Sequence, residues 1–251
     1  MYYYFNNINI YYEKHGNGEK SIIILPGWGN TRETFNEIIN YFKSTYTVYI
    51  FDYPGFGNSI FPNRDLTIFD YAYLIKNFMD DFKIEKPIII GHSFGGRLIT
   101  LLSGYYNISF QKIILIDSAG IKPKKSFKSI LKLYAYKLLK NICKLFKTKK
   151  LGQIIANYFS SADYKNLNYH MKKTFVNIVN YDLVNYLKDI KDETLIIWGE
   201  KDLDTPLKDG LLMNKLIKES GLIIIENANH YSYLYNIYHT IIIIEAFIKE
   251  K

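Results

Sequence analysis

The chain is 251 residues long and 48% of its residues are hydrophobic, as expected for one globular α/β domain, and its formal net charge is +8. Its single cysteine, Cys143, excludes an internal disulfide framework, and no apolar run approaches the roughly 18 residues that cross a bilayer. The N-terminus lacks the pattern of a signal peptide, so we expect a cytoplasmic protein.

Short β-branched runs alternate with longer amphipathic segments along the chain, which is the pattern of a parallel sheet flanked by helices. The first two runs, Tyr2–Phe5 and Ile8–Tyr12, are separated by Asn6-Asn7 and predict an antiparallel hairpin. The further runs are almost wholly apolar, as strands covered on both faces are. They are Ser21–Leu25, Thr47–Phe51, Pro87–Ile90, Ile113–Ile116, Thr194–Trp198 and Leu222–Ile225. The sequence therefore predicts an α/β fold with a mostly parallel central sheet.

Helical periodicity fills the intervals between these strands. Thr31 is placed to cap one helix, and Thr67 with Asp70 forms a start resembling a capping box for the next. Three more helices are predicted over Phe94–Ser103, Leu207–Ser220 and Asn236–Lys249. Within the last of these, the run Ile241–Ile244 taken alone would suit a strand equally well.

Residues 120–192 interrupt the alternation, because they contain helical stretches and no good strand. We interpret residues 1–251 as a single domain and residues 120–192 as a helical cap or lid inserted within it.

The insertion contains a lysine-rich segment. Eleven lysines and no acidic residue lie between Ser118 and Ala162, and Ile130–Phe146 has the periodicity of an amphipathic helix. The favoured interpretation is a lid helix with its lysines in water, and contact with an anionic membrane or attraction of acidic substrates are the alternatives. No nucleic-acid-binding motif accompanies the charge, so no nucleic acid partner is expected.

The strongest local signal is Gly91-His92-Ser93-Phe94-Gly95-Gly96, which follows a predicted strand directly and precedes a predicted helix. A Gly-x-Ser-x-Gly pattern is weak alone, but at a strand-to-helix turn it describes a nucleophile elbow. The serine of such a turn has a strained backbone, and its neighbours two residues away, Gly91 and Gly95, must be small. The same turn presents the backbone N–H of Phe94 to a developing oxyanion. We therefore predict Ser93 as a nucleophile; a glycine turn that only packs the helix on the strand is the alternative.

A serine hydroxyl needs a base that takes its proton, and the chain has five histidines. We predict His230, because it follows a strand in a loop at the carboxyl edge of the sheet, where Ser93 also lies. His92 is too close in sequence to approach Ser93 and is expected to pack beneath the turn. The remaining histidines are expected to be structural or on the surface; they are His15, His170 and His239.

Three aspartates are candidates for the acid that orients His230. Asp202 is favoured, because it lies just past a strand end and keeps the chain order Ser, Asp, His. Asp204 fits the same order but stands at a predicted helix start, where it would serve as a cap. Asp117 ends a predicted strand and is the third alternative.

The loop Leu25-Pro26-Gly27-Trp28-Gly29-Asn30 follows the first parallel strand. Its glycines let the backbone fold closely, and the backbone N–H of Trp28 is predicted as the second oxyanion donor, beside that of Phe94. We also expect Trp28 and Phe94 to contact the substrate. An ordinary Pro-Gly turn is the alternative for this loop.

Together these motifs resemble the α/β-hydrolase superfamily, and the resemblance covers nearly all of the chain except the insertion. The matching pieces are Pro26–Gly29, Asp52–Ser59, Gly91–Gly96, Trp198–Asp202 and Asn229-His230. The resemblance implies the α/β-hydrolase fold with an inserted helical cap and a triad of Ser93, Asp202 and His230. It also implies an oxyanion hole from Trp28 and Phe94, and no cofactor or metal.

The sequence departs from the pattern of the family at two positions. Family members usually have His-Gly where this chain has Pro26-Gly27, so the hydrogen bonds that support the loop differ. The residue before the histidine is often glycine and here is Asn229. A serine at position 93 argues against the relatives that use an aspartate nucleophile, the haloalkane dehalogenases and epoxide hydrolases.

From these features we expect a carboxylesterase-like serine hydrolase that cleaves an ester or thioester of a small to medium, largely apolar molecule through an acyl-enzyme. It would act as a monomer or homodimer. The same triad also suits hydrolysis of a C–C bond in a dienoic keto acid, or acyl transfer, because a fold does not fix a function. A non-catalytic binding module on a hydrolase fold and a lipase at the membrane surface are the remaining alternatives.

Overall fold

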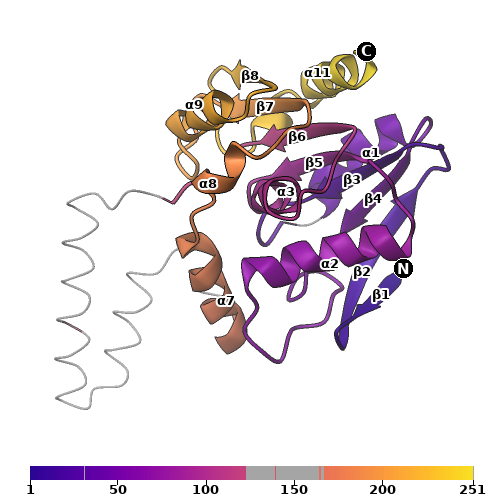
Figure 1. The fold of residues 1–251 in the computed structure, drawn as a ribbon, viewed down its shortest axis with the longest axis vertical. Helices are drawn as coiled ribbons and strands as arrows, with labels where there is room; N and C mark the ends of the chain where they lie inside the picture. Colours follow the sequence, from indigo (N-terminus) through magenta and orange to yellow (C-terminus); the bar gives the residue numbers. More distant parts are fainter. Residues whose placement is uncertain (31, 123–138, 140–163, 165–166, 251) are drawn as a thin grey trace.

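The computed structural model of the chain describes residues 1–30, 32–122, 139, 164 and 167–250 (Figure 1). Its strands form one sheet in the order β1-β2-β4-β3-β5-β6-β7-β8. They are β1 Tyr2–Phe5, β2 Ile8–His15, β3 Ser21–Leu25, β4 Thr47–Phe51, β5 Ile88–His92, β6 Lys112–Ile116, β7 Thr194–Gly199 and β8 Ser220–Ile225. β2 is antiparallel to both of its neighbours, and the other neighbouring pairs are parallel. The predicted mostly parallel sheet and its antiparallel hairpin are therefore confirmed.

Some strand ends differ from the prediction, because pairing with a neighbour extends a strand beyond its apolar run. β5 continues through Gly91 and His92, which pair with Leu115 and Ile116 of β6. β8 begins at Ser220, which pairs with Thr194. The helix that was predicted to reach Ser220 is accordingly shorter and ends at Leu216.

Helices cover both faces of the sheet. They are η1 Arg32–Phe35, α1 Asn36–Phe42, α2 Ile68–Asp81, α3 Phe94–Gly104, α7 Tyr169–Asn180, α8 Val184–Leu187, α9 Leu207–Leu216, α10 Ser232–Tyr235 and α11 Ile237–Lys249. Side chains of a strand alternate between the faces, so Ile23 and Leu25 join the core under α2 and α3, whereas Ile22 and Ile24 join the core under α1 and α11. Figure 1 shows α2 and α3 together in front of the sheet.

The helix starts agree in part with the sequence prediction. Thr67 and Asp70 form a reciprocal capping box at the start of α2, as predicted. Residues 237–249 are helical, so the isoleucine run within them is not a strand. Thr31 lies outside the described residues, and the chain after it forms a short 3₁₀ helix before α1 begins at Asn36.

The predicted insertion, residues 120–192, is described only in part. Its described helices are α7 and α8, whereas the lysine-rich stretch Ile130–Phe146 falls almost wholly outside the described residues. Within the part of the chain that the structure describes, no helix has the length and apolar character needed to cross a membrane.

Candidate active site

Four loops meet at the edge of the sheet where the parallel strands end. They follow β3, β5, β7 and β8 and contain Trp28, Ser93, Asp202 and His230, respectively. Such an edge is where α/β folds build their ligand sites. A cavity of about 270 Å³ opens there and is lined by Trp28, Ser93, Phe94 and His230, among other described residues. Its volume is suitable for a small molecule.

Ser93 lies in a sharp turn between β5 and α3 and has φ 49° and ψ −107°. This left-handed conformation is strained for a residue with a side chain. The turn is possible only because its flanking glycines lack a Cβ. A Cβ on Gly91 would lie 2.7 Å from the carbonyl carbon of Gly95, and one on Gly95 would collide with the carbonyl oxygen of Leu25. The backbone N–H of Ser93 donates to Ile116 of β6, which fixes the turn against the sheet.

Ser93, His230 and Asp202 form a continuous chain of hydrogen bonds. The distance from Ser93 Oγ to His230 Nε2 is 2.9 Å, and that from His230 Nδ1 to Asp202 Oδ2 is 2.8 Å. A carboxylate only accepts, so Nδ1 carries the proton, and Nε2 is left to accept the proton of the serine. The Asp202 side chain is fully buried and that of His230 is 14% exposed. The arrangement is that of a serine activated by a neutral imidazole.

The electrostatics of the pair favour a charged imidazole beside a charged carboxylate. Burial by itself lowers the pKa of His230, but the hydrogen bond and charge of Asp202 outweigh it and hold that pKa above its usual range. Burial likewise raises the pKa of Asp202, and the bonds from His230 and Thr205 reverse this effect and lower it. An imidazole of raised basicity is a better proton acceptor for a serine hydroxyl.

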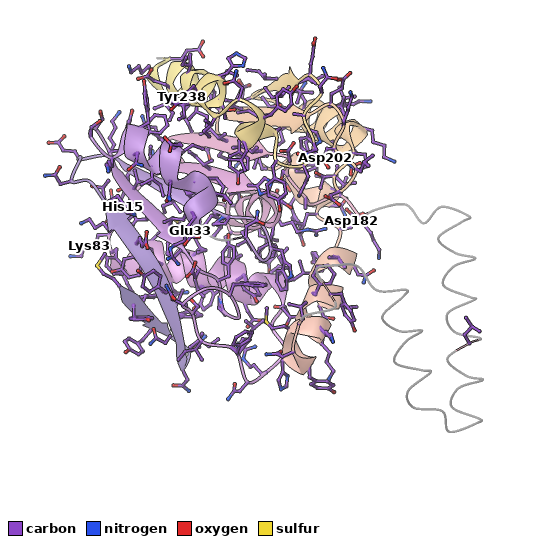
Figure 2. The ribbon with its side chains drawn as sticks, turned by 180° about the vertical axis from the view of Figure 1, so that it is seen from behind. His15, Glu33, Lys83, Asp182, Asp202 and Tyr238 are labelled. Atoms are coloured by element: carbon purple, nitrogen blue, oxygen red, sulfur yellow. The ribbon has the colours of Figure 1, made fainter. Side chains whose placement is uncertain are left out.

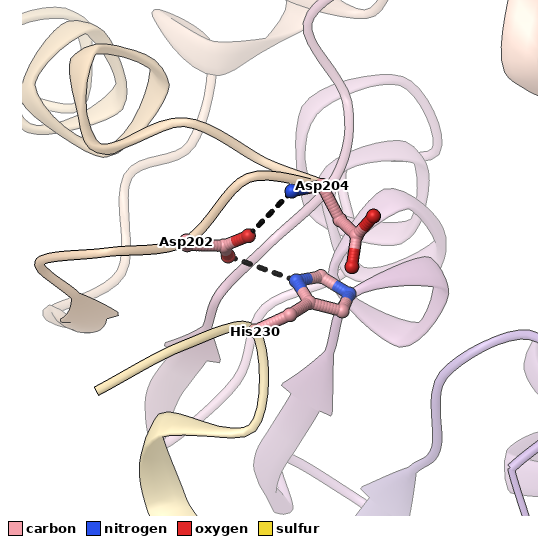
Figure 3. Close-up of side chains that lie close together, drawn as sticks. All are labelled: Asp202, Asp204 and His230. Atoms are coloured by element: carbon pink, nitrogen blue, oxygen red, sulfur yellow. Dashed lines mark hydrogen bonds and ion pairs between the residues drawn. The ribbon is translucent and has the colours of Figure 1, made fainter.

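Asp202 is held by the loop that contains it (Figure 3). Its Oδ1 accepts the backbone N–H groups of Asp204 and Thr205 at 2.8 and 2.9 Å. Asp204 itself is exposed, and the helix-cap role predicted for it is wrong, because the N-cap of α9 is Pro206 and has no side-chain cap bond.

Asp117 makes different contacts from those of Asp202. Its carboxylate accepts the backbone N–H of Gly199 at 2.8 Å and that of Ser232 at 2.9 Å, so it joins the end of β7 to the start of α10, just past His230. Burial raises its pKa to about 7, against the effect of these bonds. Asp117 therefore anchors the histidine loop, whereas Asp202 is the carboxylate bonded to the imidazole.

Thr205 is a site residue that the sequence interpretation missed. Its hydroxyl lies 2.6 Å from Asp202 Oδ2, 3.2 Å from His230 Nδ1 and 3.0 Å from the carbonyl oxygen of Asp117. Because the contact with Asp202 is the shortest, we infer that the hydroxyl of Thr205 donates its single proton to Asp202. The sequence showed only a threonine before a proline at a helix start, a pattern that does not reveal this contact.

His92 is fully buried, and its side chain joins two loops. Its Nε2 is 2.8 Å from the carbonyl oxygen of His230, and its Nδ1 is 3.2 Å from the side-chain amide nitrogen of Asn30. Complete burial lowers the pKa of His92 to about 3, so the ring is neutral and donates from Nε2. Tyr231 donates to the same Asn30 side chain at 3.1 Å. These bonds support the Pro-Gly loop, where the family usually has a histidine.

The two predicted oxyanion donors belong to residues that line the cavity together with Ser93. Phe94 is the first residue of α3, so its backbone N–H has no acceptor within the helix. In the described ranges, neither this group nor the backbone N–H of Trp28 makes a hydrogen bond. The two rings pack edge to face with centroids 5.3 Å apart, and Phe175 of α7 packs on Trp28 at 5.6 Å.

Asp202, Asp204 and His230 also have the side-chain types and the proximity of a possible metal site. Both oxygens of Asp202 and both ring nitrogens of His230 are already hydrogen-bonded to protein groups. Figure 3 shows two of these bonds, from Asp202 to the backbone of Asp204 and to His230. These bonds favour a proton relay over a metal centre, whose ligands keep a lone pair free for the ion.

The sequence of this chain is similar to those of known hydrolases. A family model described as alpha/beta hydrolase fold matches residues 20–143. The chain is 28% identical to the pimeloyl-[acyl-carrier protein] methyl ester esterase of Wigglesworthia glossinidia brevipalpis, over 94% of this chain and 96% of the relative. It is 26% identical to the 2-hydroxy-6-oxo-6-phenylhexa-2,4-dienoate hydrolase of Comamonas testosteroni, over 89% and 85% of the two chains.

Solved structures are also similar. The crystal structure of MGS-M2, an alpha/beta hydrolase enzyme from a Medee basin deep-sea metagenome library, superposes with a TM-score of 0.78 over 100% of this chain and 98% of that one. The two sequences are 18% identical, so this likeness concerns the fold. It agrees with the fold that the sequence predicted.

Proposed function

Because the chain belongs to the α/β-hydrolase superfamily, we propose that it is a serine hydrolase that cleaves a carboxylic ester or thioester through an acyl-enzyme on Ser93. The observation that carries the proposal is the unbroken relay from Ser93 through His230 to Asp202, which opens into a cavity. The esterase among its curated relatives, similar over almost the whole chain, supports an ester as the substrate.

In the first half of the reaction, Ser93 Oγ attacks the carbonyl carbon of the ester, and His230 Nε2 takes the serine proton. The oxygen of the tetrahedral intermediate becomes negative and is held by the backbone N–H groups of Trp28 and Phe94. His230 then gives its proton to the leaving alcohol or thiol, and the acyl group stays on the serine.

In the second half, water takes the place of the alcohol. His230 Nε2 takes a proton from the water, which attacks the acyl-enzyme and releases the acid, and Ser93 recovers its proton. Asp202 keeps the imidazole in one tautomer and stabilises its positive charge in both halves. We also propose that residues 120–192 form the cap of this site, because Phe175, Ile178 and Val179 of α7 line the cavity.

A fluorophosphonate probe and a chain-length series of p-nitrophenyl esters test the proposal. The wild-type protein should be labelled and should hydrolyse at least one ester, whereas Ser93→Ala should do neither. If the probe labels Ser93→Ala as strongly as the wild type, the nucleophile is another residue. If the wild type is neither labelled nor active, the chain is a binding module and the proposal is wrong.

A second candidate is hydrolysis of a C–C bond, which is supported by the dienoate hydrolase among the curated relatives. The same serine, histidine and aspartate would serve this reaction on a dienoic keto acid. Turnover of the p-nitrophenyl esters should be compared with that of a carbon-bonded substrate on the same enzyme sample. A kcat/KM that is higher for the carbon-bonded substrate would favour this second candidate over the first.

A further inference from the structure

Arg97 is a buried cation in the lining of the cavity, and it has no role in the reaction described above. It lies one helical turn after Ser93 on α3, is 5% exposed and lines the cavity. Burying a charged side chain costs free energy unless an opposite charge or several hydrogen bonds compensate it. A buried arginine in a substrate cavity therefore requires an explanation.

Part of the guanidinium is used by the protein. Nη1 donates to the backbone carbonyl oxygens of Ile178 at 3.1 Å and Tyr181 at 2.9 Å, at the C-terminal end of α7. A cation is favourable at that end of a helix. These bonds use two of the five N–H donors of arginine, and the other three have no acceptor among the described residues.

The charge of Arg97 is also not neutralised by the described part of the chain, because no carboxylate there lies within ion-pair distance of the guanidinium. Burial lowers its pKa to about 10, and Asp182 acts against this from a distance. Asp182 is exposed and accepts the backbone N–H of Val184; Figure 2 labels it in the segment that follows α7. Arg97 thus stays positively charged at neutral pH.

The sequence of the remaining residues offers little compensation. Between residues 123 and 166 it contains one acidic residue, Asp163, and eleven lysines. Two acidic side chains, Asp204 and Asp209, also line the cavity, but neither is among the groups that shift the pKa of Arg97. No carboxylate among the described residues neutralises this buried cation, and a negatively charged ligand in the cavity would do so.

The position of Arg97 indicates which part of a substrate it meets. His230 must protonate the leaving group, so the leaving group belongs on the side of the cavity lined by His230 and Thr205. The bonds of Arg97 to the carbonyl oxygens of Ile178 and Tyr181 place it against the end of α7, whose apolar residues Ile178 and Val179 also line the cavity. This surface suits an acyl chain, and the arginine suits a carboxylate on that chain, because a guanidinium matches a carboxylate in shape and charge.

We propose that Arg97 binds a carboxylate on the acyl part of the substrate, so that the preferred substrates are half-esters or half-thioesters of dicarboxylic acids. The inference rests on the proposed hydrolase function and narrows its substrate class. In addition, the two bonds to α7 make Arg97 a link between the helix of the nucleophile and the base of the cap.

The test compares matched pairs of esters. Mono-p-nitrophenyl esters of the straight-chain acids from adipic to suberic acid are paired with p-nitrophenyl esters of monocarboxylic acids of the same carbon number. With Ser93→Ala as the background, wild-type kcat/KM should be about tenfold or more higher for the charged member of at least one pair. If both members are hydrolysed and the charged one is never preferred, the inference is wrong and the proposed function stands. If neither member of any pair is hydrolysed, the proposed hydrolase function is wrong, and the inference that rests on it is wrong as well.

Variants assign the preference to Arg97. In Arg97→Met the ratio of charged to neutral kcat/KM should fall to about one or below, and Arg97→Lys should keep part of it, because the charge remains. A purely structural role would lower both values and leave the ratio unchanged, which would overturn the proposal. If Arg97→Met does not fold, Val179→Glu provides a second test of the same preference. Val179 follows Ile178 in the chain and lines the same cavity as Arg97, so a carboxylate at this position should compete for the guanidinium and reduce the ratio as well.

A second pair of substrates tests the acyl assignment. Phenyl butyrate and 4-carboxyphenyl butyrate have the charge on the leaving group instead. Their ratio should be the same in wild type and Arg97→Met. A ratio that depends on Arg97 in this pair, and not in the half-ester series, would overturn the placement of the carboxylate on the acyl side.

Discussion

Two parts of the candidate active site differ in how the hydrogen-bonding groups of their side chains are satisfied. We call Ser93, Asp202 and His230 the floor, and Arg97, Phe175, Ile178 and Val179 the wall. Each reactive atom of the floor has a protein hydrogen-bond partner at 2.6–2.9 Å. The wall is mostly apolar, and its one cation keeps three N–H donors for which the described residues offer no acceptor. The hydrogen bonds of the floor are thus formed before a ligand binds, whereas the free N–H donors of the wall gain their acceptor from the ligand.

From this difference we expect the chemistry to depend on the floor and the substrate specificity to depend on the wall. A preorganised network costs no rearrangement in the transition state, so changes in the floor should act mainly on kcat. An incomplete wall gains its partner on binding, so changes there should act on the choice of substrate.

The largest effect is expected for Ser93→Ala, which removes the nucleophile of the floor. Loss of a nucleophilic serine lowers kcat by about 10⁵–10⁶. Steady-state hydrolysis of the best p-nitrophenyl ester measures it. Ser118→Ala is the control, because Ser118 is also buried but donates only to the carbonyl of Ala119, and it should keep activity within about threefold of the wild type. An equal loss in both variants would assign the effect to folding.

The next effect is expected for Asp202→Asn, which replaces the acceptor of the Nδ1 proton. The amide would favour the wrong tautomer and should lower kcat by about 10⁴. Asp204→Asn is the matched variant two residues away, and it should cost less than about tenfold, because Asp204 is exposed and not bonded to the imidazole. A larger loss in Asp204→Asn than in Asp202→Asn would exchange their roles.

The pH dependence should report the same contact. A protonated His230 does not accept the serine proton, so kcat/KM should fall as the pH falls through the pKa of this imidazole. Asp202 holds that pKa above the usual 6.5, so the acid limb of the wild-type profile should lie above pH 6.5. In Asp202→Asn the limb should move to lower pH, since burial then acts without the carboxylate. A limb that does not move would mean that another group titrates.

A smaller effect is expected for Thr205→Val, which removes the hydroxyl bonded to Asp202 and keeps the shape of the side chain. A hydrogen bond to a charged group contributes about 1.5–3 kcal/mol, so kcat should fall by about 10- to 150-fold, with little change in KM. Thr205→Ser keeps the hydroxyl and should keep most of the activity. If both variants lose activity equally, the methyl group and not the hydroxyl is responsible.

The smallest effect is expected in the wall. Phe175→Ala removes a ring that packs on Trp28 and lines the cavity. It should shift the preferred acyl chain length toward longer chains and change kcat/KM among neighbouring lengths by about tenfold, the lower end of the range of about 1–3 kcal/mol that a methylene contributes in an apolar pocket. The rate of labelling by a small fluorophosphonate should change less than this. A kcat loss as large as that of Asp202→Asn would place Phe175 in the floor.

Much of the fold and the local form of the Ser93 turn could be predicted from the sequence, because both depend on short-range patterns. Alternating apolar runs define parallel strands, and the glycines around Ser93 are needed by any strand-to-helix turn of this sharpness. Strand ends were less predictable, since the pairing of Ser220 with Thr194 depends on a neighbour 26 residues away.

The position of each side chain at the edge of the sheet was decided by the tertiary structure. Asp202, Asp204 and Asp117 all follow strand ends, and the sequence left all three as candidates for the acid. The fold directs Asp202 to the imidazole at 2.8 Å, leaves Asp204 exposed in the cavity lining without a bond to the imidazole, and commits Asp117 to two backbone N–H groups. Thr205 and Arg97 had no recognisable pattern, because their partners are far away in the chain. Local periodicity determines which elements form, whereas long-range packing determines which polar groups meet and which are left for a ligand.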